Sequence, residues 1–384
     1  MPIEGELIVR LDCDGRRIRQ VNVHSTRPVI AARVLTGRAA ADAAATVPLL
    51  FSLCGVAQGA AAATALAAAG AKELHADPAG RDREVLLESL QDTFRHLLID
   101  WPAAIGGAPC PAPVAAARCE IASSMRAGAG RRPRHDVKTM RELGRCVSAL
   151  AAEAIFGLPV AQWRELADAD ALLAWCAHRG TVVAVMLGDL AANDPMLCRS
   201  AVPLMPPAQG DLLRRVVVPA MHALPAFARV PTWAGSPVET GALARMRDDP
   251  LVASVHERFG NAVVTRIVAR LAELALLIQE LDGTGARPGA PPRIQGMALG
   301  DGEGLAAVET ARGLLLHRAI VREECVVDYQ IVAPTEWNFH PDGALARGLE
   351  GFDVDDEGRL LRCARLAVHA LDPCVASRIE VGHA

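Results

Sequence analysis

The chain has 384 residues, of which 51% are hydrophobic, so it can bury a sizeable core in one large domain or in two or three smaller ones. Its formal net charge of −4 is close to neutral and argues against a nucleic acid or an anionic membrane surface as partner. Alanine is abundant and aromatic residues make up only 3%. Because alanine is the best helix former, this composition favours a mostly helical protein.

The ten cysteines are scattered over the whole chain, and no two of them show the CxxC spacing of a zinc ribbon or a thioredoxin motif. The N-terminus lacks the basic segment and the apolar run of a signal peptide. We therefore expect a cytoplasmic protein in a reducing compartment, with thiols that are mostly free and buried.

The first predicted element is a β hairpin within residues 1–38, because apolar residues alternate with polar ones on both sides of the turn signal Asp14-Gly15. The segment 39–71 is almost free of ionisable side chains and could be mistaken for a membrane span. Its alanines gain little from lipid, however, and Pro48 and several glycines interrupt it. We predict core helices that are apolar all round and no membrane span.

Apolar residues at helical spacing predict further helices at 84–98, 137–156, 159–175 and 261–281. Stretches rich in glycine and proline predict loops at 106–113 and 128–134 and a linker at 283–293. Beyond the linker the pattern changes to short strands at 304–308, 314–321 and 326–332. The predicted fold is mainly α with small β elements (α+β). It is one intertwined domain, 1–384, with a hairpin region (1–38), a helical body (39–282) and a C-terminal β/α part (294–384).

Two cysteine motifs lie near opposite ends of the chain. Residues 52–61, SLCGVAQGAA, resemble the signature Arg-x-Cys-Gly-x-Cys-x-x-x-His of nickel–iron hydrogenase large subunits, with Ala57 in place of the second cysteine. Residues 371–380, LDPCVASRIE, resemble their C-terminal signature Asp-Pro-Cys-x-x-Cys-x-x-His, with Ser377 in place of the second cysteine. The histidines are also replaced, by Ala61 and Glu380.

A third segment extends the resemblance. ETARG (309–313), followed by His317, Tyr329-Gln330 and PTEWN (334–338), is similar to the ordered series Glu-x-Pro-Arg-Gly…His, Tyr-Gln and Pro-Thr-Thr-Trp-Asn. The opening IEGEL (3–7) is similar to the Glu-Gly-His-Leu start of the same subunits.

Within this superfamily, the loss of one cysteine from each pair resembles the HupK/HoxV hydrogenase maturation proteins, as does Asp100-Trp101-Pro102. The resemblance covers both ends of the chain in the right order and implies a hydrogenase large-subunit-like fold. The middle, about 70–292, fits by helical character and length alone.

The resemblance implies a changed metal site. In the related hydrogenases four thiolates hold the metals: two bridge nickel and iron, and two bind nickel only. The iron also carries carbon monoxide and two cyanides. Both bridging positions are lost here, as Ala57 and Ser377, so we expect no nickel and no hydrogen turnover. Cys54 and Cys374, 320 positions apart (374 − 54), are expected to meet and bind iron through soft thiolates. Whether one or both bind it is left open.

The resemblance also implies a rim for cyanide ligands. Arg312 matches the guanidinium that lies over the diatomic ligands, and Thr335, after Pro334, matches the hydroxyl that donates to a cyanide. Asp372 matches an acidic residue that could orient Arg312. The expected cargo is an Fe(CN)2(CO) fragment, held transiently and passed to the apo hydrogenase large subunit. A HypC-like chaperone and a HypD-like assembly factor are the expected partners.

Other interpretations stay open. The chain could be a metal-free interaction protein that docks maturation factors, whereas the lost thiolates argue against an active hydrogenase. Arg312 could be a packed structural arginine, and Thr335 could satisfy a turn. We read His96, which has no spacing partner, as an ordinary residue and most remaining cysteines as core residues. Since the sequence stops four residues after Glu380, we expect no C-terminal extension of the kind that a protease removes after nickel insertion.

Overall fold

The structure, a computed structural model, describes residues 5–27, 30–74, 78–126, 137–285, 291–353 and 355–383. Residues 3 and 4 of the N-terminal motif, the predicted loop at 128–134 and part of the predicted linker at 283–293 lie outside these ranges. Helices predominate and strands gather at the two ends of the chain, in agreement with the predicted α+β class.

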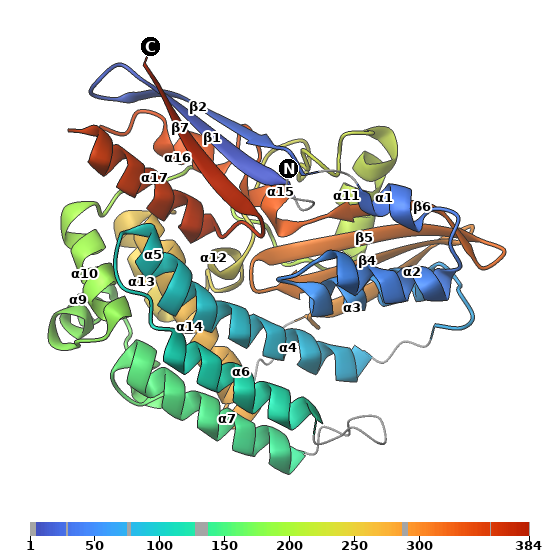
Figure 1. The fold of residues 1–384 in the computed structure, drawn as a ribbon, viewed down its shortest axis with the longest axis horizontal. Coiled ribbons are helices and arrows are strands. Elements are labelled where there is room, and N and C mark those ends of the chain that lie inside the picture. Colours follow the sequence, from blue (N-terminus) through green and yellow to red (C-terminus); the bar gives the residue numbers. More distant parts are fainter. Residues whose placement is uncertain are drawn as a thin grey trace.

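One sheet brings the two ends of the chain together. Strands β1 (Glu6–Cys13) and β2 (Ile18–Ser25) form the predicted antiparallel hairpin, and β7 (Ala376–His383) pairs with β1 in parallel. Leu7 and Val9 of β1 are buried, and Leu7 lies opposite Ser377 of β7. The second cysteine motif therefore lies beside the N-terminal hairpin, as Figure 1 shows.

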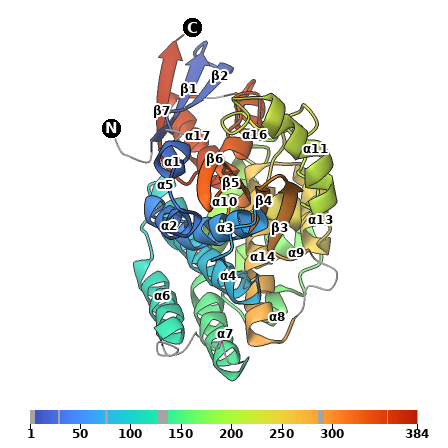
Figure 2. The ribbon, with the colours of Figure 1, turned by 90° about the vertical axis from the view of Figure 1, so that its right-hand side faces the viewer.

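A second sheet contains β3 (Ile294–Gly300), β4 (Glu303–Thr310), β5 (Gly313–Arg322) and β6 (Cys325–Val332), antiparallel and in that order. Helix α3 (Gly55–Ala68) covers one face, and α11 (Gly210–Ala223) packs on the other side (Figure 2). Ala306 and Val308 of β4 join the core under α3, whereas Leu305 and Ala307 join the core with α11. Because both faces of β4 and β5 are buried, these two strands have near-continuous apolar sequences. The sequence analysis missed β3.

The helical body surrounds α14 (Val263–Asp282), which is buried along most of its length and confirms the helix predicted at 261–281. α4 (Pro78–Arg95) continues through a π-helical turn, η2 (His96–Asp100), into α5 (Trp101–Ala104). α7 (Val137–Ala151) likewise continues into a π-helical turn, η3 (Ala152–Phe156). The remaining helices are α1 (Ile30–Leu35), α2 (Ala40–Thr46), the 3₁₀ helix η1 (Val47–Leu50), α6 (Pro111–Arg126), α8 (Val160–Trp163), α9 (Ala169–His178), α10 (Val182–Asn193), α12 (Ala242–Arg245), α13 (Pro250–Phe259), α15 (Pro334–Asn338), α16 (Ala344–Leu349) and α17 (Glu357–Leu371).

Two predicted boundaries are wrong for local reasons. The helix predicted at 159–175 is two helices, because Asp168 caps α9 by accepting from Ala171 N at 2.8 Å. The loop predicted at 106–113 ends early, since Pro111 occupies the first position of α6. The segment 39–71 is divided at Pro48 and again before Cys54, in agreement with the predicted interruption of its helices. In the described ranges, no helix combines the length and apolarity that crossing a membrane requires.

Candidate functional site

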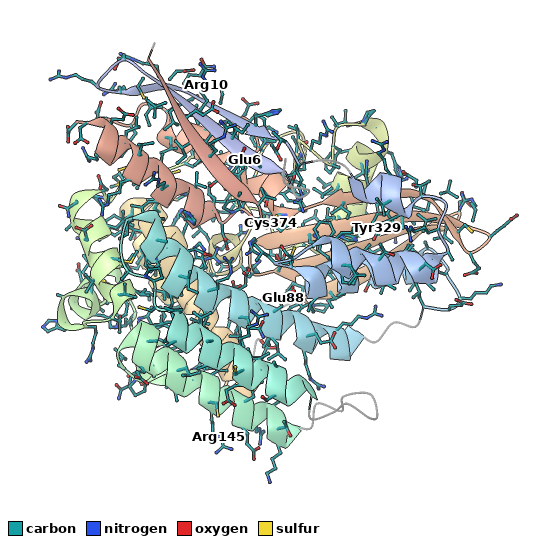
Figure 3. All side chains as sticks on the ribbon, in the orientation of Figure 1. Glu6, Arg10, Glu88, Arg145, Tyr329 and Cys374 are labelled. Carbon is teal, nitrogen blue, oxygen red and sulfur yellow. The ribbon has the colours of Figure 1, made fainter. Side chains whose placement is uncertain are left out.

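The structure brings Cys54 and Cys374 close enough to interact electrostatically. Cys54 is the N-cap residue of α3, and Cys374, labelled in Figure 3, lies between α17 and β7. Both cysteines are half-buried. Burial first, and then the charge of Cys374, raises the pKa of Cys54 to about 12.

A carboxylate from α4 fixes the loop that carries Cys54. The Glu88 oxygens accept hydrogen bonds from Val56 N at 2.8 Å and from Ala57 N at 2.9 Å, which caps the first turn of α3. Burial raises the pKa of Glu88 to about 7, against the lowering effect of these two bonds. A Cβ on Gly55 would lie 2.9 Å from Pro48 O, so the close turn beside Cys54 requires glycine.

Thr335 fixes the position of Cys374. Its Oγ1 accepts from Cys374 N at 3.2 Å and donates to Cys374 Sγ at 3.1 Å. Pro334 begins α15, where the fixed φ of proline suits the first helical position, and this places Thr335 beneath the cysteine. The hydroxyl that the sequence analysis assigned to a cyanide therefore donates to a sulfur here. Ser377, at the lost thiolate position, is exposed on β7.

Arg312 lies at the turn between β4 and β5 and is almost fully buried. Its Nη1 lies 2.6 Å from Asp92 Oδ2, its Nη2 donates to Asp92 Oδ1 at 2.8 Å, and its Nε lies 3.5 Å from Asp372 Oδ1. Burial opposes the charge, yet Asp372 and Asp92, and then the two cysteines, raise the pKa of Arg312. The Nε–H has no hydrogen-bond partner among the described residues. A fixed cation thus faces the sulfurs.

Asp372 is shared by several groups. Its φ of +53° ends α17, and its Oδ2 accepts from Arg270 Nη1 at 2.9 Å, while His96 Nδ1 lies 3.4 Å from Oδ1. Burial alone would raise the pKa of Asp372, but His96, Arg312 and Arg270 hold it well below the usual value. His96 belongs to the π-helical turn η2, and such turns are frequent at functional sites. The sequence analysis did not place His96 near Asp372, and whether His96 has a functional role stays untested.

A second cation, Arg27, contacts the sulfur of Cys374. Its Nη1 donates to Cys374 Sγ at 3.3 Å and lies 3.5 Å from Glu336 Oε2. The guanidinium carbon lies 5.5 Å from the ring centre of Phe51. The sequence analysis missed Arg27, because it lies outside every motif and only the pairing of β1 with β7 brings it to Cys374.

A buried hydrogen-bonded chain leads to Cys54. Gln58 Nε2 donates to Cys54 Sγ at 3.8 Å, and Gln58 Oε1 and Tyr329 Oη lie 2.8 and 2.7 Å from the two ring nitrogens of His317. Burial lowers the pKa of His317 to about 3, so the imidazole is neutral at pH 7. A neutral ring that donates to Gln58 and accepts from Tyr329 leaves the Gln58 amide N–H groups free to face the sulfur.

The site residues expected from sequence therefore come together: Cys54, Cys374, Arg312, Thr335, Asp372 and Pro334. Asp372 was expected to orient Arg312, but the closer contacts of Arg312 are with Asp92. The roles of these residues toward a metal stay predictions. The helical spacing of Glu88 and Asp92 on α4, one turn apart, could have identified two further members.

All ten cysteines are free, as predicted. The expectation that the remaining cysteines are core residues is confirmed for Cys13, Cys176, Cys198 and Cys363, which are buried, and is wrong for Cys146 and Cys325, which are exposed.

Donors and cations near the two sulfurs favour the thiolate form, whereas burial opposes it and raises the pKa of Cys54. Each cysteine sulfur faces at least one N–H or O–H donor, and two guanidinium groups flank the pair. Hydrogen bonds to a charged form favour that form, and such outer contacts orient metal ligands. Two soft thiolates beside fixed cations suit one soft metal that itself carries anionic, hydrogen-bond-accepting ligands.

Comparison with solved structures places this fold among hydrogenase large subunits. The chain is similar to the Ni-Fe-Se hydrogenase from Desulfomicrobium baculatum, with a TM-score of 0.64 and 15% identity, covering 95% of both chains. It is similar to the Ni-Fe-Se hydrogenase from D. vulgaris Hildenborough, with a TM-score of 0.63 and 17% identity, covering 94% of both chains. Residues 223–379 match the family described as nickel-dependent hydrogenase.

Curated relatives match over nearly the whole chain. The chain is 34% identical to the hydrogenase expression/formation protein HupV of Azotobacter chroococcum and 31% identical to HupK of Azotobacter vinelandii, covering 99% of each pair of chains. It is 31% identical to HoxV of Cupriavidus necator, covering 92% of this chain and 91% of the relative. These names support a role in hydrogenase maturation. The chain belongs to the HupK/HoxV family of hydrogenase expression/formation proteins.

Proposed function

We propose that this protein is a maturation scaffold that holds an Fe(CN)2(CO) fragment at Cys54 and Cys374 and passes it to the apo large subunit of a nickel–iron hydrogenase. The observation that carries this proposal is that two cysteines, 320 positions apart, interact electrostatically with each other and with the buried cation Arg312. A core cysteine would need neither a donor aimed at its sulfur nor a fixed cation.

The donors around the sulfurs match this cargo. Iron that brings one carbon monoxide and two cyanides needs few protein ligands, and two thiolates suffice. Asp92 occupies two of the five N–H groups of Arg312, and the Nε–H of Arg312 lacks a hydrogen-bond partner among the described residues. The remaining N–H groups can donate to a cyanide nitrogen, a charge-assisted contact of the stronger kind.

The lost thiolate positions argue against a bimetallic centre. Ala57 is fully buried and has no donor atom, and Ser377 is an exposed, hard oxygen ligand on β7. We therefore propose a scaffold without hydrogenase activity. A transfer role calls for a HypC-like chaperone and a HypD-like assembly factor that supply the fragment, and for the apo large subunit that receives it.

Infrared spectroscopy tests the proposal directly. The protein is co-expressed with the maturation machinery, purified without oxygen and examined for cyanide and carbonyl bands together with iron content. We expect these bands in the wild type and in Cys110→Ala, a control at another half-buried cysteine, and their loss in Cys374→Ala. The absence of bands from the wild type, or bands that persist in a variant lacking both Cys54 and Cys374, would rule out this carrier function.

A second function, metal-free docking of maturation factors, has one observation in its favour. Leu49 and Leu53, which precede Cys54 in the chain, are large hydrophobic side chains that are 85% and 38% exposed. Under this alternative, Cys54→Ala and Cys374→Ala leave hydrogenase maturation unaffected, whereas Leu49→Asp impairs it. The carrier function predicts that both cysteine variants impair maturation.

A further inference from the structure

Arg27 contacts the Cys374 sulfur from a segment that carries no recognised motif. We propose that Arg27 is a specificity residue: its guanidinium occupies the place beside Cys374 where a second metal ion would bind, so that the thiolate pair rejects bare divalent cations and admits one ligand-bearing iron. The inference rests on the proposed function for the identity of the admitted cargo, but the exclusion of cations can be measured without it.

The contacts of the Cys374 sulfur limit how many metals it can bind. A thiolate sulfur has three lone pairs. One accepts from Thr335 Oγ1 at 3.1 Å and a second accepts from Arg27 Nη1 at 3.3 Å. One lone pair remains, which allows a single metal bond and leaves none for a bridge to a second metal.

Two side chains flank the guanidinium, and a close backbone contact fixes the residue that carries it. Glu336 Oε2 lies 3.5 Å from Nη1, and the face of Phe51 lies 5.5 Å from the guanidinium carbon. Gly5, at a φ of +79°, packs against the backbone of Arg27 so closely that a Cβ there would lie 2.5 Å from Arg27 Cα. Burial opposes the charge, but Cys374 and Glu336 raise the pKa of Arg27, which stays protonated at every physiological pH.

A carrier with two thiolates needs such a device. Nickel, copper and zinc dications bind sulfur and nitrogen sites more tightly than iron does, so an open thiolate pair would be filled by the wrong metal. A fixed positive charge a few ångströms away repels each of these dications. Iron(II) with two cyanides is formally neutral and avoids this repulsion, while its cyanide nitrogens accept hydrogen bonds from a guanidinium.

The simpler alternative is that Arg27 only neutralises the buried Glu336. The two interpretations differ in what Arg27→Gln does to metal binding by the apo protein. If Arg27 is only a counter-ion, the variant changes stability and leaves metal binding as it was. If Arg27 excludes cations, the variant gains a binding site that depends on Cys374.

Titration of the purified apo protein with Co²⁺ separates these outcomes, because cobalt bound to thiolates gives a charge-transfer absorption. We expect weak binding by the wild type and by Arg27→Lys, which keeps the charge. Arg27→Gln should bind one equivalent at least about tenfold more tightly, by removing a repulsion between close charges. This gain should vanish when Cys374→Ala is added. Arg19→Gln removes an exposed arginine paired with Asp14 and serves as the matched control.

Equal cobalt affinity in the wild type and in Arg27→Gln overturns the inference. Tight binding of one equivalent of Co²⁺ by the wild type at Cys54 and Cys374 also overturns it, and that result does not depend on whether a variant folds. Thermal unfolding checks that Arg27→Gln is folded, and Arg27→Met replaces it if it is not. The infrared test stands apart. If the wild type shows no cyanide bands but still excludes cobalt, only the carrier function is refuted. If the wild type shows normal bands but binds cobalt tightly, only the role of Arg27 is refuted.

Discussion

The pair of Arg312 and Asp92 offers the sharpest test of the buried charge network. Both side chains are nearly inaccessible, with 3% and 6% of their surface exposed, and their closest nitrogen and oxygen lie 2.6 Å apart. Asp92→Asn keeps the shape and removes the charge, which leaves a buried guanidinium with Asp372 at 3.5 Å. Breaking a buried pair costs about 3–5 kcal/mol, and because Asp372 remains we expect about 3 kcal/mol of lost unfolding free energy.

An exposed pair provides the matched control. Arg258 and Asp170 lie at the same 2.6 Å, but 46% and 87% of their side-chain surface is exposed, so Asp170→Asn should cost less than about 1 kcal/mol. Urea unfolding followed by tryptophan fluorescence compares the two variants. Equal losses for Asp92→Asn and Asp170→Asn would show that burial does not set the strength of the Arg312 pair, and would refute this account of how Arg312 is held.

Three further predictions use other parts of the structure. His317 has a pKa of about 3 in the folded protein and 6.5 in the unfolded chain, so the stability that its neutral ring contributes is intact above pH 6.5 and is lost as the pH falls toward 3, by about 1.4 kcal/mol per pH unit. In urea unfolding between pH 7 and 5, the unfolding free energy of His317→Gln should therefore depend less steeply on pH than that of the wild type. An equal slope in the two proteins would contradict this. Gly304→Ala should lower the unfolding free energy by about 3 kcal/mol, because its Cβ would lie 2.2 Å from Ala65 O and push α3 off β4; a loss below about 0.5 kcal/mol in urea unfolding would be inconsistent with that contact. Brief treatment of the native protein with iodoacetamide should modify the exposed Cys119, Cys146 and Cys325 and spare the buried Cys198 and Cys363. Mass spectrometry identifies the labelled cysteines, and early labelling of the buried pair would contradict their placement.

Much of the local structure follows from the sequence because it depends on neighbouring residues. Alternation around Asp14-Gly15 determines the N-terminal hairpin, and helical spacing determines α4 and α14. Boundaries failed where a single side chain decides them, as with Asp168 at the start of α9. Strand β3 was missed because its own sequence predicts a strand only weakly, and the strand forms by pairing with β4.

The sequence by itself determined which chemical groups are present: two cysteines in recognisable motifs, the arginine Arg312, and the loss of thiolates at Ala57 and Ser377. Only the tertiary structure decided what surrounds them, because ion pairs and hydrogen bonds join residues hundreds of positions apart. Asp92 reaches Arg312 across 220 positions, and Arg27 reaches Cys374 across 347. No local pattern encodes such pairs, since they form only when the strands and helices that carry them pack together.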